Sequence, residues 1–135
     1  PYIGAGPTVG NYVTVAWNAR REAVRAVNDA LPMLERADQV DVLSVNPRVG
    51  PEDHGEIPSA DICLHLARHG VSATAQSVVA NDIDVANLLM SRCADTGSDM
   101  IVMGAYGHSR LRESVLGGTT HDVLRSMTVP VLMSH

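Results

Sequence analysis

One glycine-rich segment toward the end of the chain, GAYGHSRLRESVLGGTT, contains the residue types that hold phosphate groups. Its glycines and threonines are Gly104, Gly107, Gly117, Gly118, Thr119 and Thr120. Glycines let backbone N–H groups approach a phosphate closely, and a helix that begins after them adds a partial positive charge. A simple turn followed by an N-cap at Thr119, with Asp122 three residues later, explains the same residues. Spacing alone leaves both interpretations open.

The same segment also carries cations and one carboxylate. His108, Arg110 and Arg112 would offset the charge of a bound phosphate, although an exposed loop explains them equally well. Glu113 is its only carboxylate, so no general base is evident and any hydrolysis or autophosphorylation is expected to be slow. For autophosphorylation, the nearest acceptor hydroxyls are those of Ser109, Thr119 and Thr120.

A second group of residues has the spacing of metal ligands. His65 and His69 are four residues apart on a predicted helix, with Asp61 one turn earlier. The glutamate of a metalloprotease HExxH motif is absent, and a polar helix face explains the group better than a zinc-dependent hydrolase. We expect no metal site here, and we expect Asp53 and His54 to lie in a solvated turn.

Strands are predicted to alternate with helices along the chain, which positions these residues. Short β-rich or apolar runs predict strands over residues 12–17, 40–45, 71–79, 100–103 and 129–133. Apolar residues at helical spacing predict helices over 20–37, 59–69, from Asp82 or Asp84 to Gly97, and 119–126. Pro32 should kink or shorten the first helix, and Pro130 assigns the last strand to an edge or to pairing with another molecule. The pattern predicts a doubly wound α/β domain, whose ligands bind outside the carboxyl ends of the strands.

Composition narrows the class of protein. The chain has 135 residues, 45% hydrophobic and 19% charged, with a formal net charge of −5. This profile predicts one soluble globular domain and argues against binding to nucleic acid or to an anionic membrane. The two cysteines, Cys63 and Cys93, favour a reducing cytoplasm, and Cys93 falls on the apolar stripe of its predicted helix. Residues 1–11 are expected to form a linker or extended lead-in before a domain over 12–135, and the chain is expected to be part of a longer one.

Gly104, Gly107 and Gly117 are separated by two and by nine residues, which resembles the G-x2-G-x9-G nucleotide-binding signature of the universal stress protein family. The runs VTVAWN, DMIVMG and VPVLM also resemble family blocks, so the resemblance covers residues 12–135. The run GHSRLRESVLGG is similar to a proteobacterial branch in which two such domains often occur in tandem. The resemblance implies a Rossmann-like, five-stranded parallel sheet of order 3-2-1-4-5 with helices on both faces.

The resemblance further implies that ATP, or ADP or AMP, with or without magnesium, binds as a regulatory ligand in the bacterial stress response. It assigns the base and ribose to Ala16, Asn18 and Val45. It assigns the phosphates to Gly104, Gly107, His108, Gly117, Gly118, Thr119 and Thr120. Three departures bear on binding: Asn18 replaces the family's Asp, Ala19-Arg20 replaces Gly-Ser, and Gly118 stands where a Ser or Thr would donate a hydroxyl.

These departures favour an alternative of another class, a nucleotide-free dimerisation or interaction module with the same fold. In the family the last strand often pairs with its twofold mate, and here residues 129–133 supply an apolar edge. We therefore expect a homodimer, or pairing with a second domain of the same kind, through the last strand.

Overall fold

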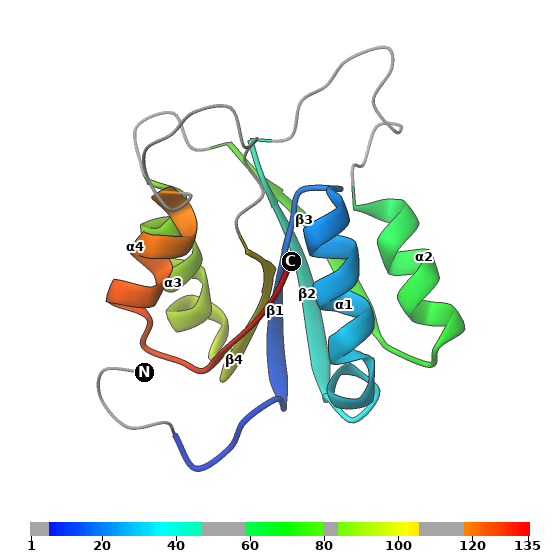
Figure 1. The fold of residues 1–135 in the computed structure, drawn as a ribbon. Helices are drawn as coiled ribbons and strands as arrows, with labels where there is room; N and C mark the ends of the chain where they lie inside the picture. The colour runs from blue at the N-terminus through cyan, green and yellow to red at the C-terminus, as the bar shows by residue number, and fades with distance from the viewer. Residues whose placement is uncertain (1–5, 47–58, 80–83, 106–117) are drawn as a thin grey trace.

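The computed structural model describes residues 6–46, 59–79, 84–105 and 118–135 of the chain (Figure 1). Within them strands and helices alternate, as predicted. The elements are β1 (Tyr12–Trp17), α1 (Arg21–Leu34), β2 (Gln39–Val45), α2 (Ala60–Arg68), β3 (Ala73–Val78), α3 (Val85–Thr96), β4 (Met100–Gly104), α4 (Gly118–Ser126) and β5 (Val131–Ser134).

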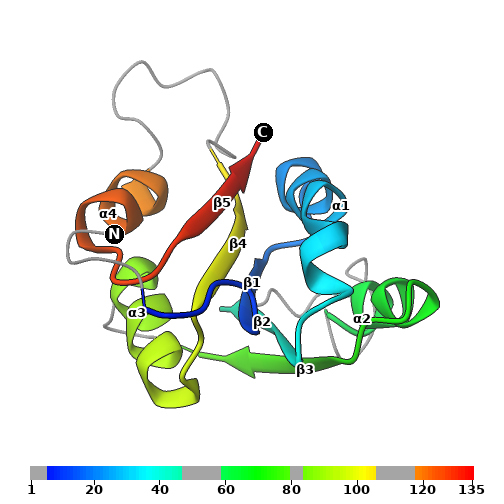
Figure 2. The same ribbon diagram turned by 90° about the horizontal axis from the view of Figure 1, so that it is seen from below.

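All neighbouring strands are parallel, in the order β3-β2-β1-β4-β5, which confirms the predicted topology. Val15 of β1 pairs with Val42 of β2 on one side and with Val102 of β4 on the other. Helices α1 and α2 cover one face of the sheet, and α3 and α4 cover the other (Figure 2). The winding reverses between β1 and β4, so their carboxyl ends form the switch point at which such sheets bind ligands.

Alternating strand residues build a separate core on each face, because successive side chains of a strand point to opposite sides. The core under α1 and α2 contains Val15, Val42 and Val102, and the core under α3 and α4 contains Leu43 and Ile101. The run from Met100 to Met103 is buried throughout, as expected for a central strand apolar on both faces.

The ends of α1 and α3 follow local signals. Asp84, one of the two predicted caps, accepts hydrogen bonds from the N–H groups of Ala86 (3.1 Å) and Asn87 (3.3 Å). Gly97 ends α3 in the left-handed conformation, at φ +70°. Helix α1 continues past Pro32 but ends at Leu34, three residues before its predicted end.

Two expectations near the carboxyl end of the chain are corrected. Thr119 is not an N-cap, because α4 already begins at Gly118 and includes Thr119 in its first turn. Strand β5 begins at Val131, so Pro130 precedes it, and the Pro130 carbonyl accepts a hydrogen bond from the Ile101 N–H (2.9 Å). Because the N–H and C=O of a residue point to the same side of its strand, the Pro130 nitrogen also faces β4, where it has no hydrogen to donate. The regular pairing accordingly begins at Val131, and β5 still lies at an edge, as predicted.

The end of the lead-in is attached to the start of β4. The Asp99 carboxylate accepts hydrogen bonds from the backbone N–H groups of Gly10 (2.9 Å), Asn11 (3.2 Å) and Tyr12 (3.1 Å). Gly10 is buried and has a φ of +85°, which a glycine adopts without steric cost. This arrangement aligns the first residues of β1 with β4.

Candidate functional site

The carboxyl ends of β1 and β4 bring two distant parts of the predicted site together. Ala16 pairs with Met103, so Asn18 and Gly104 follow at the same edge of the sheet. Ala16 and Val45 both pack against the core under α3 and α4, and both are half-buried. The structure therefore places Ala16, Asn18, Val45 and Gly104 along one edge, as a nucleotide site at the switch point requires.

The connection from β1 to α1 is tight and strained. The Asn18 side-chain oxygen accepts a hydrogen bond from the Arg20 N–H (3.1 Å), while the exposed Ala19 has a φ of +56°. A left-handed conformation costs a residue with a Cβ roughly 1–2 kcal/mol. Ala19 stands where the family pattern has glycine, so this chain keeps the turn without the residue that makes it inexpensive.

Gly104 is a glycine for a packing reason that the sequence does not reveal. A Cβ atom at this position would lie 2.6 Å from the Ala23 nitrogen and 2.7 Å from the Glu22 carbonyl carbon. Both are backbone atoms of the first turn of α1, so they cannot move as a side chain can. Gly104 therefore lets α1 lie directly against the end of β4.

The start of α4 presents three predicted phosphate ligands with different exposure. Gly118 is exposed, Thr119 is half-buried and Thr120 is only 5% exposed. The Thr120 hydroxyl is therefore badly placed for a ligand, whereas the backbone of Gly118 and Thr119 is available at a helix N-terminus. A Cβ on Gly118 would find no atom nearer than the Asp122 carboxylate, at 4.0 Å.

The rest of the glycine-rich segment lies outside the described residues. This applies to Gly107, His108 and Gly117 among the predicted ligands, and to Ser109, Arg110, Arg112 and Glu113. Asp53 and His54 also lie outside them.

Two buried serine hydroxyls, at the end of β2 and before α2, could not be predicted from the sequence. Ser44, in β2, is 4% exposed, and Ser59, which precedes α2, is fully buried. Neither Oγ atom has a hydrogen-bond partner among the described residues. A buried hydroxyl without a partner costs about 1–3 kcal/mol. Ser44 pairs with Trp17, so its side chain lies on the sheet face under α1 and α2, opposite Ala16 and Val45. Serines give no sequence signal of this kind, because burial and partners depend on the tertiary structure.

The histidine pair on α2 is close but incomplete as a metal site. The ring centroids of His65 and His69 are 4.8 Å apart, and His65 Nε2 is buried without a hydrogen-bond partner in the described part of the chain. Asp61 is exposed. In the described part of the chain, no group of three or more His, Cys, Asp or Glu side chains is placed to hold a metal ion. The pair therefore does not support a metal-dependent hydrolase.

The cysteines do not suit nucleophilic chemistry. Burial raises the pKa of the Cys63 thiol. Burial also raises the pKa of Cys93, and a hydrogen bond with Thr14 only partly offsets this effect. Cys93 is 2% exposed, which confirms its predicted place in the core. A raised thiol pKa leaves little of the reactive thiolate at neutral pH.

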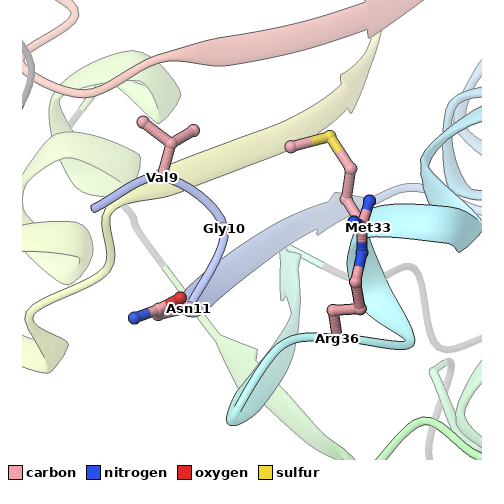
Figure 3. A pocket seen from close by; sticks show the side chains of 5 residues that line it. All are labelled: Val9, Gly10, Asn11, Met33 and Arg36. Atoms are coloured by element: carbon pink, nitrogen blue, oxygen red, sulfur yellow. The ribbon is translucent and has the colours of Figure 1, made fainter.

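A pocket of about 280 Å³ lies at the other end of the strands, beside the amino end of β1 (Figure 3). It is lined by Val9, Gly10, Asn11, Met33 and Arg36. Arg36 already donates from Nε to the Pro32 carbonyl (2.9 Å). This pocket is remote from the predicted ligand residues, which lie at the carboxyl ends of the strands.

No helix in the described residues has the length and apolarity to span a membrane.

The topology and the alternation of strands and helices define a doubly wound α/β domain. The universal stress protein family model matches residues 13–135. The chain therefore belongs to the universal stress protein family.

A curated relative, universal stress protein Slr1230 of Synechocystis, is 53% identical over 38 residues, which span 28% of this chain and 13% of that protein. The solved structure of the protein MJ0577 matches with a TM-score of 0.71 and 21% identity, covering 94% of this chain and 96% of that one. A family protein of Arabidopsis thaliana with AMP bound has a TM-score of 0.60, 20% identity, and coverage of 92% and 90%. A universal stress protein in complex with cAMP has a TM-score of 0.65, 18% identity, and coverage of 93% and 96%. At these identities the structural matches establish the shared fold.

Proposed function

We propose that this domain binds ATP, or ADP or AMP, as a regulatory ligand at the carboxyl edge of β1, β2 and β4. The observation that carries the proposal is the placement of Ala16, Asn18, Val45 and Gly104 along that one edge, at the point where the winding reverses. Two proteins of the same fold bind AMP and cAMP, which supports an adenine nucleotide as the ligand class.

Each part of a nucleotide has a suitable partner in the proposed site. Ala16 and Val45 offer apolar sides to the base, and the Asn18 amide offers donors to the base or ribose. The N-terminus of α4, at Gly118, supplies N–H groups for phosphate oxygens.

The proposed role is regulation in the cytoplasmic stress response, and bound magnesium would screen the phosphate charge. The glycine-rich segment has a single carboxylate, Glu113, so a proton acceptor for attacking water is not evident there. Nucleotide turnover is accordingly expected to be slow, and occupancy of the site is the signal.

The first test is the ligand that the protein carries. Protein purified without added nucleotide is denatured, and the supernatant is separated by anion exchange with mass detection. Stoichiometric ATP, ADP or AMP is the expected result. An empty supernatant, together with no thermal shift on adding Mg-ATP, would overturn the proposal.

A matched pair of variants tests the phosphate end of the site. Gly118→Ser restores the hydroxyl of the family pattern, while Gly118→Ala adds the same Cβ without it, and the Cβ fits in either case. A hydrogen bond to a charged group contributes about 1.5–3 kcal/mol, so Gly118→Ser should bind ATP at least about tenfold more tightly than Gly118→Ala. Equal dissociation constants in calorimetry would contradict phosphate binding at this helix start.

A second candidate function is a pairing module that has lost its nucleotide. The strained Ala19 and the missing hydroxyl at Gly118 favour it, as does the edge strand β5, whose four residues are all half-buried. Anion exchange of the supernatant of the denatured protein separates the two candidates, because only the regulatory nucleotide binder requires a bound nucleotide.

A further inference from the structure

Helix α1 holds the end of β5 through side chains on its outer face. Ser134 donates from Oγ to the Asp29 carboxylate (2.7 Å), and Arg25 donates from Nη1 to the backbone oxygen of His135 (3.0 Å). Arg25 and Asp29 are one helical turn apart, and their Nε and Oδ2 atoms are separated by 3.9 Å. Figure 2 shows the end of β5 beside α1. These contacts join residues more than a hundred positions apart in the sequence.

The backbone of the same residue, Ser134, holds the end of β4. Ser134 pairs with Gly104, and its carbonyl accepts a hydrogen bond from the Ala105 N–H (2.8 Å). Ala105 directly follows Gly104 of the proposed site, and it is 3% exposed. Ser134 thus connects α1, through its hydroxyl, with the end of β4 at Gly104.

Resting on the proposed function, we infer that Asp29 and Ser134 are positioning residues for the nucleotide site. The Asp29 carboxylate fixes Ser134, and Ser134 fixes Gly104 and Ala105 at the end of β4, where Gly104 belongs to the proposed site.

This role has a physical reason, because the end of β5 and the end of β4 both need support. The end of an edge strand frays easily unless it is tied down, because only one neighbouring strand holds it. A hydroxyl-to-carboxylate hydrogen bond is of the strong, charge-assisted kind. Residues that touch a ligand bind it well only when a second layer of contacts holds them in place. Gly104 packs against the first turn of α1, so the same helix contacts the end of β4 directly and, through Ser134, by way of β5.

The binding test compares Ser134→Ala and Asp29→Ala with the wild type. Each is expected to weaken ATP binding about three- to tenfold in calorimetry, the equivalent of losing one hydrogen bond. The double variant should bind no more weakly than either single variant, since both remove the same contact. Ser134→Thr, which keeps the hydroxyl, and Asp29→Asn, which keeps an acceptor, should stay within about twofold of the wild type. Asn28→Ala is the control, because the Asn28 side chain is exposed on the same helix and donates to the Val24 carbonyl (2.8 Å), within α1.

Hydrogen exchange at the Ala105 amide provides a readout that needs no ligand. The amide should exchange faster in Ser134→Ala and Asp29→Ala than in Asn28→Ala, while the core amides of β1 exchange at unchanged rates. Unchanged ATP affinity in the two alanine variants would overturn the inference, whether or not Ala105 exchanges faster. If the wild type itself binds no adenine nucleotide, the proposed function fails, and the positioning role falls with it. Ala105 exchange then still shows whether the contact holds β4.

Discussion

At the residue scale, two backbone positions at the proposed site differ in how they relate to the family motif: Gly104 matches it, and Ala19 departs from it. Gly104 is part of the predicted glycine signature, yet its lack of a Cβ is explained by the approach of α1, without any ligand. Ala19 lacks the glycine that its φ of +56° favours, so the turn before α1 stores strain. A glycine that matches a binding motif can therefore serve packing first, and a departure from the motif can be tolerated at an energetic cost.

We predict that Gly104→Ala destabilises the fold by about 1–3 kcal/mol, the usual cost of overpacking. The added Cβ would meet backbone atoms of Glu22 and Ala23 at 2.6–2.7 Å, so either α1 or β4 must shift. Urea unfolding followed by circular dichroism measures the change. Gly6→Ala is the matched control, because a Cβ there meets nothing within 4 Å. Equal unfolding midpoints for the two variants would show that α1 moves aside at little cost.

The sequence predicted which residue types gather at the site but not how they are supported. Hydrophobic patterns predict where the strands of Ala16, Asn18, Val45 and Gly104 end. The strand order that brings these residues together was implied by the resemblance to the universal stress protein family. The buried hydroxyls of Ser44 and Ser59, and the contact between Asp29 and Ser134, could not be predicted in this way. They arise where segments distant in the sequence meet, and serine and aspartate carry no periodic signal.

At the element scale, boundaries were predictable where a local signal marks them. Asp84 and Gly97 define α3 because an N-cap carboxylate and a left-handed glycine act on the neighbouring backbone. The end of α1 was missed by three residues, since Pro32 disfavours further helix without fixing where it stops. The attachment of the lead-in to Asp99 was also missed, because Gly10 and Asp99 are 89 positions apart.

Asp99 should make the stability of this attachment depend on pH. Burial on its own raises the pKa of Asp99, but hydrogen bonds from the Thr8 side chain and from the backbone of Tyr12, Asn11 and Gly10 outweigh it and hold the pKa below its ordinary value. A carboxyl group whose folded pKa is lowered stabilises the fold above its unfolded pKa, about 3.9, and loses that contribution as pH falls through the folded value.

We therefore predict that Asp99→Asn lowers the free energy of unfolding by about 1 kcal/mol at neutral pH, a modest value because the carboxylate is partly exposed to solvent. Thermal unfolding of both proteins from pH 7 to pH 2.5 measures the effect. The difference between them should shrink steadily below about pH 4. A difference that stays constant across this range would mean that the negative charge of Asp99 contributes nothing to the attachment.

At the scale of the whole molecule, the sheet ends in two unequal edges. Strand β3 is rich in small and polar residues, whereas β5 is the sequence VLMS and packs against both cores. The carbonyls of Pro130 and Ser134 accept hydrogen bonds from β4. Alternate residues of a parallel strand face the same neighbour, so Val131 and Met133 direct their backbone N–H and C=O groups outward. An apolar edge with outward-facing donors and acceptors is suited to pairing with another strand.

We predict that the domain forms a homodimer through this edge, and that Met133→Pro makes it monomeric. Proline removes the outward N–H of residue 133 while leaving the hydrogen bonds between β4 and β5 in place. Met133→Ala is the matched control, because it removes the same side chain and keeps the N–H. Sedimentation equilibrium should give a dimer for the wild type and for Met133→Ala, and a folded monomer, verified by circular dichroism, for Met133→Pro. A wild type that stays monomeric at the highest soluble concentration would leave this edge to a second domain of the same kind, and a dimeric proline variant would move the interface to another surface.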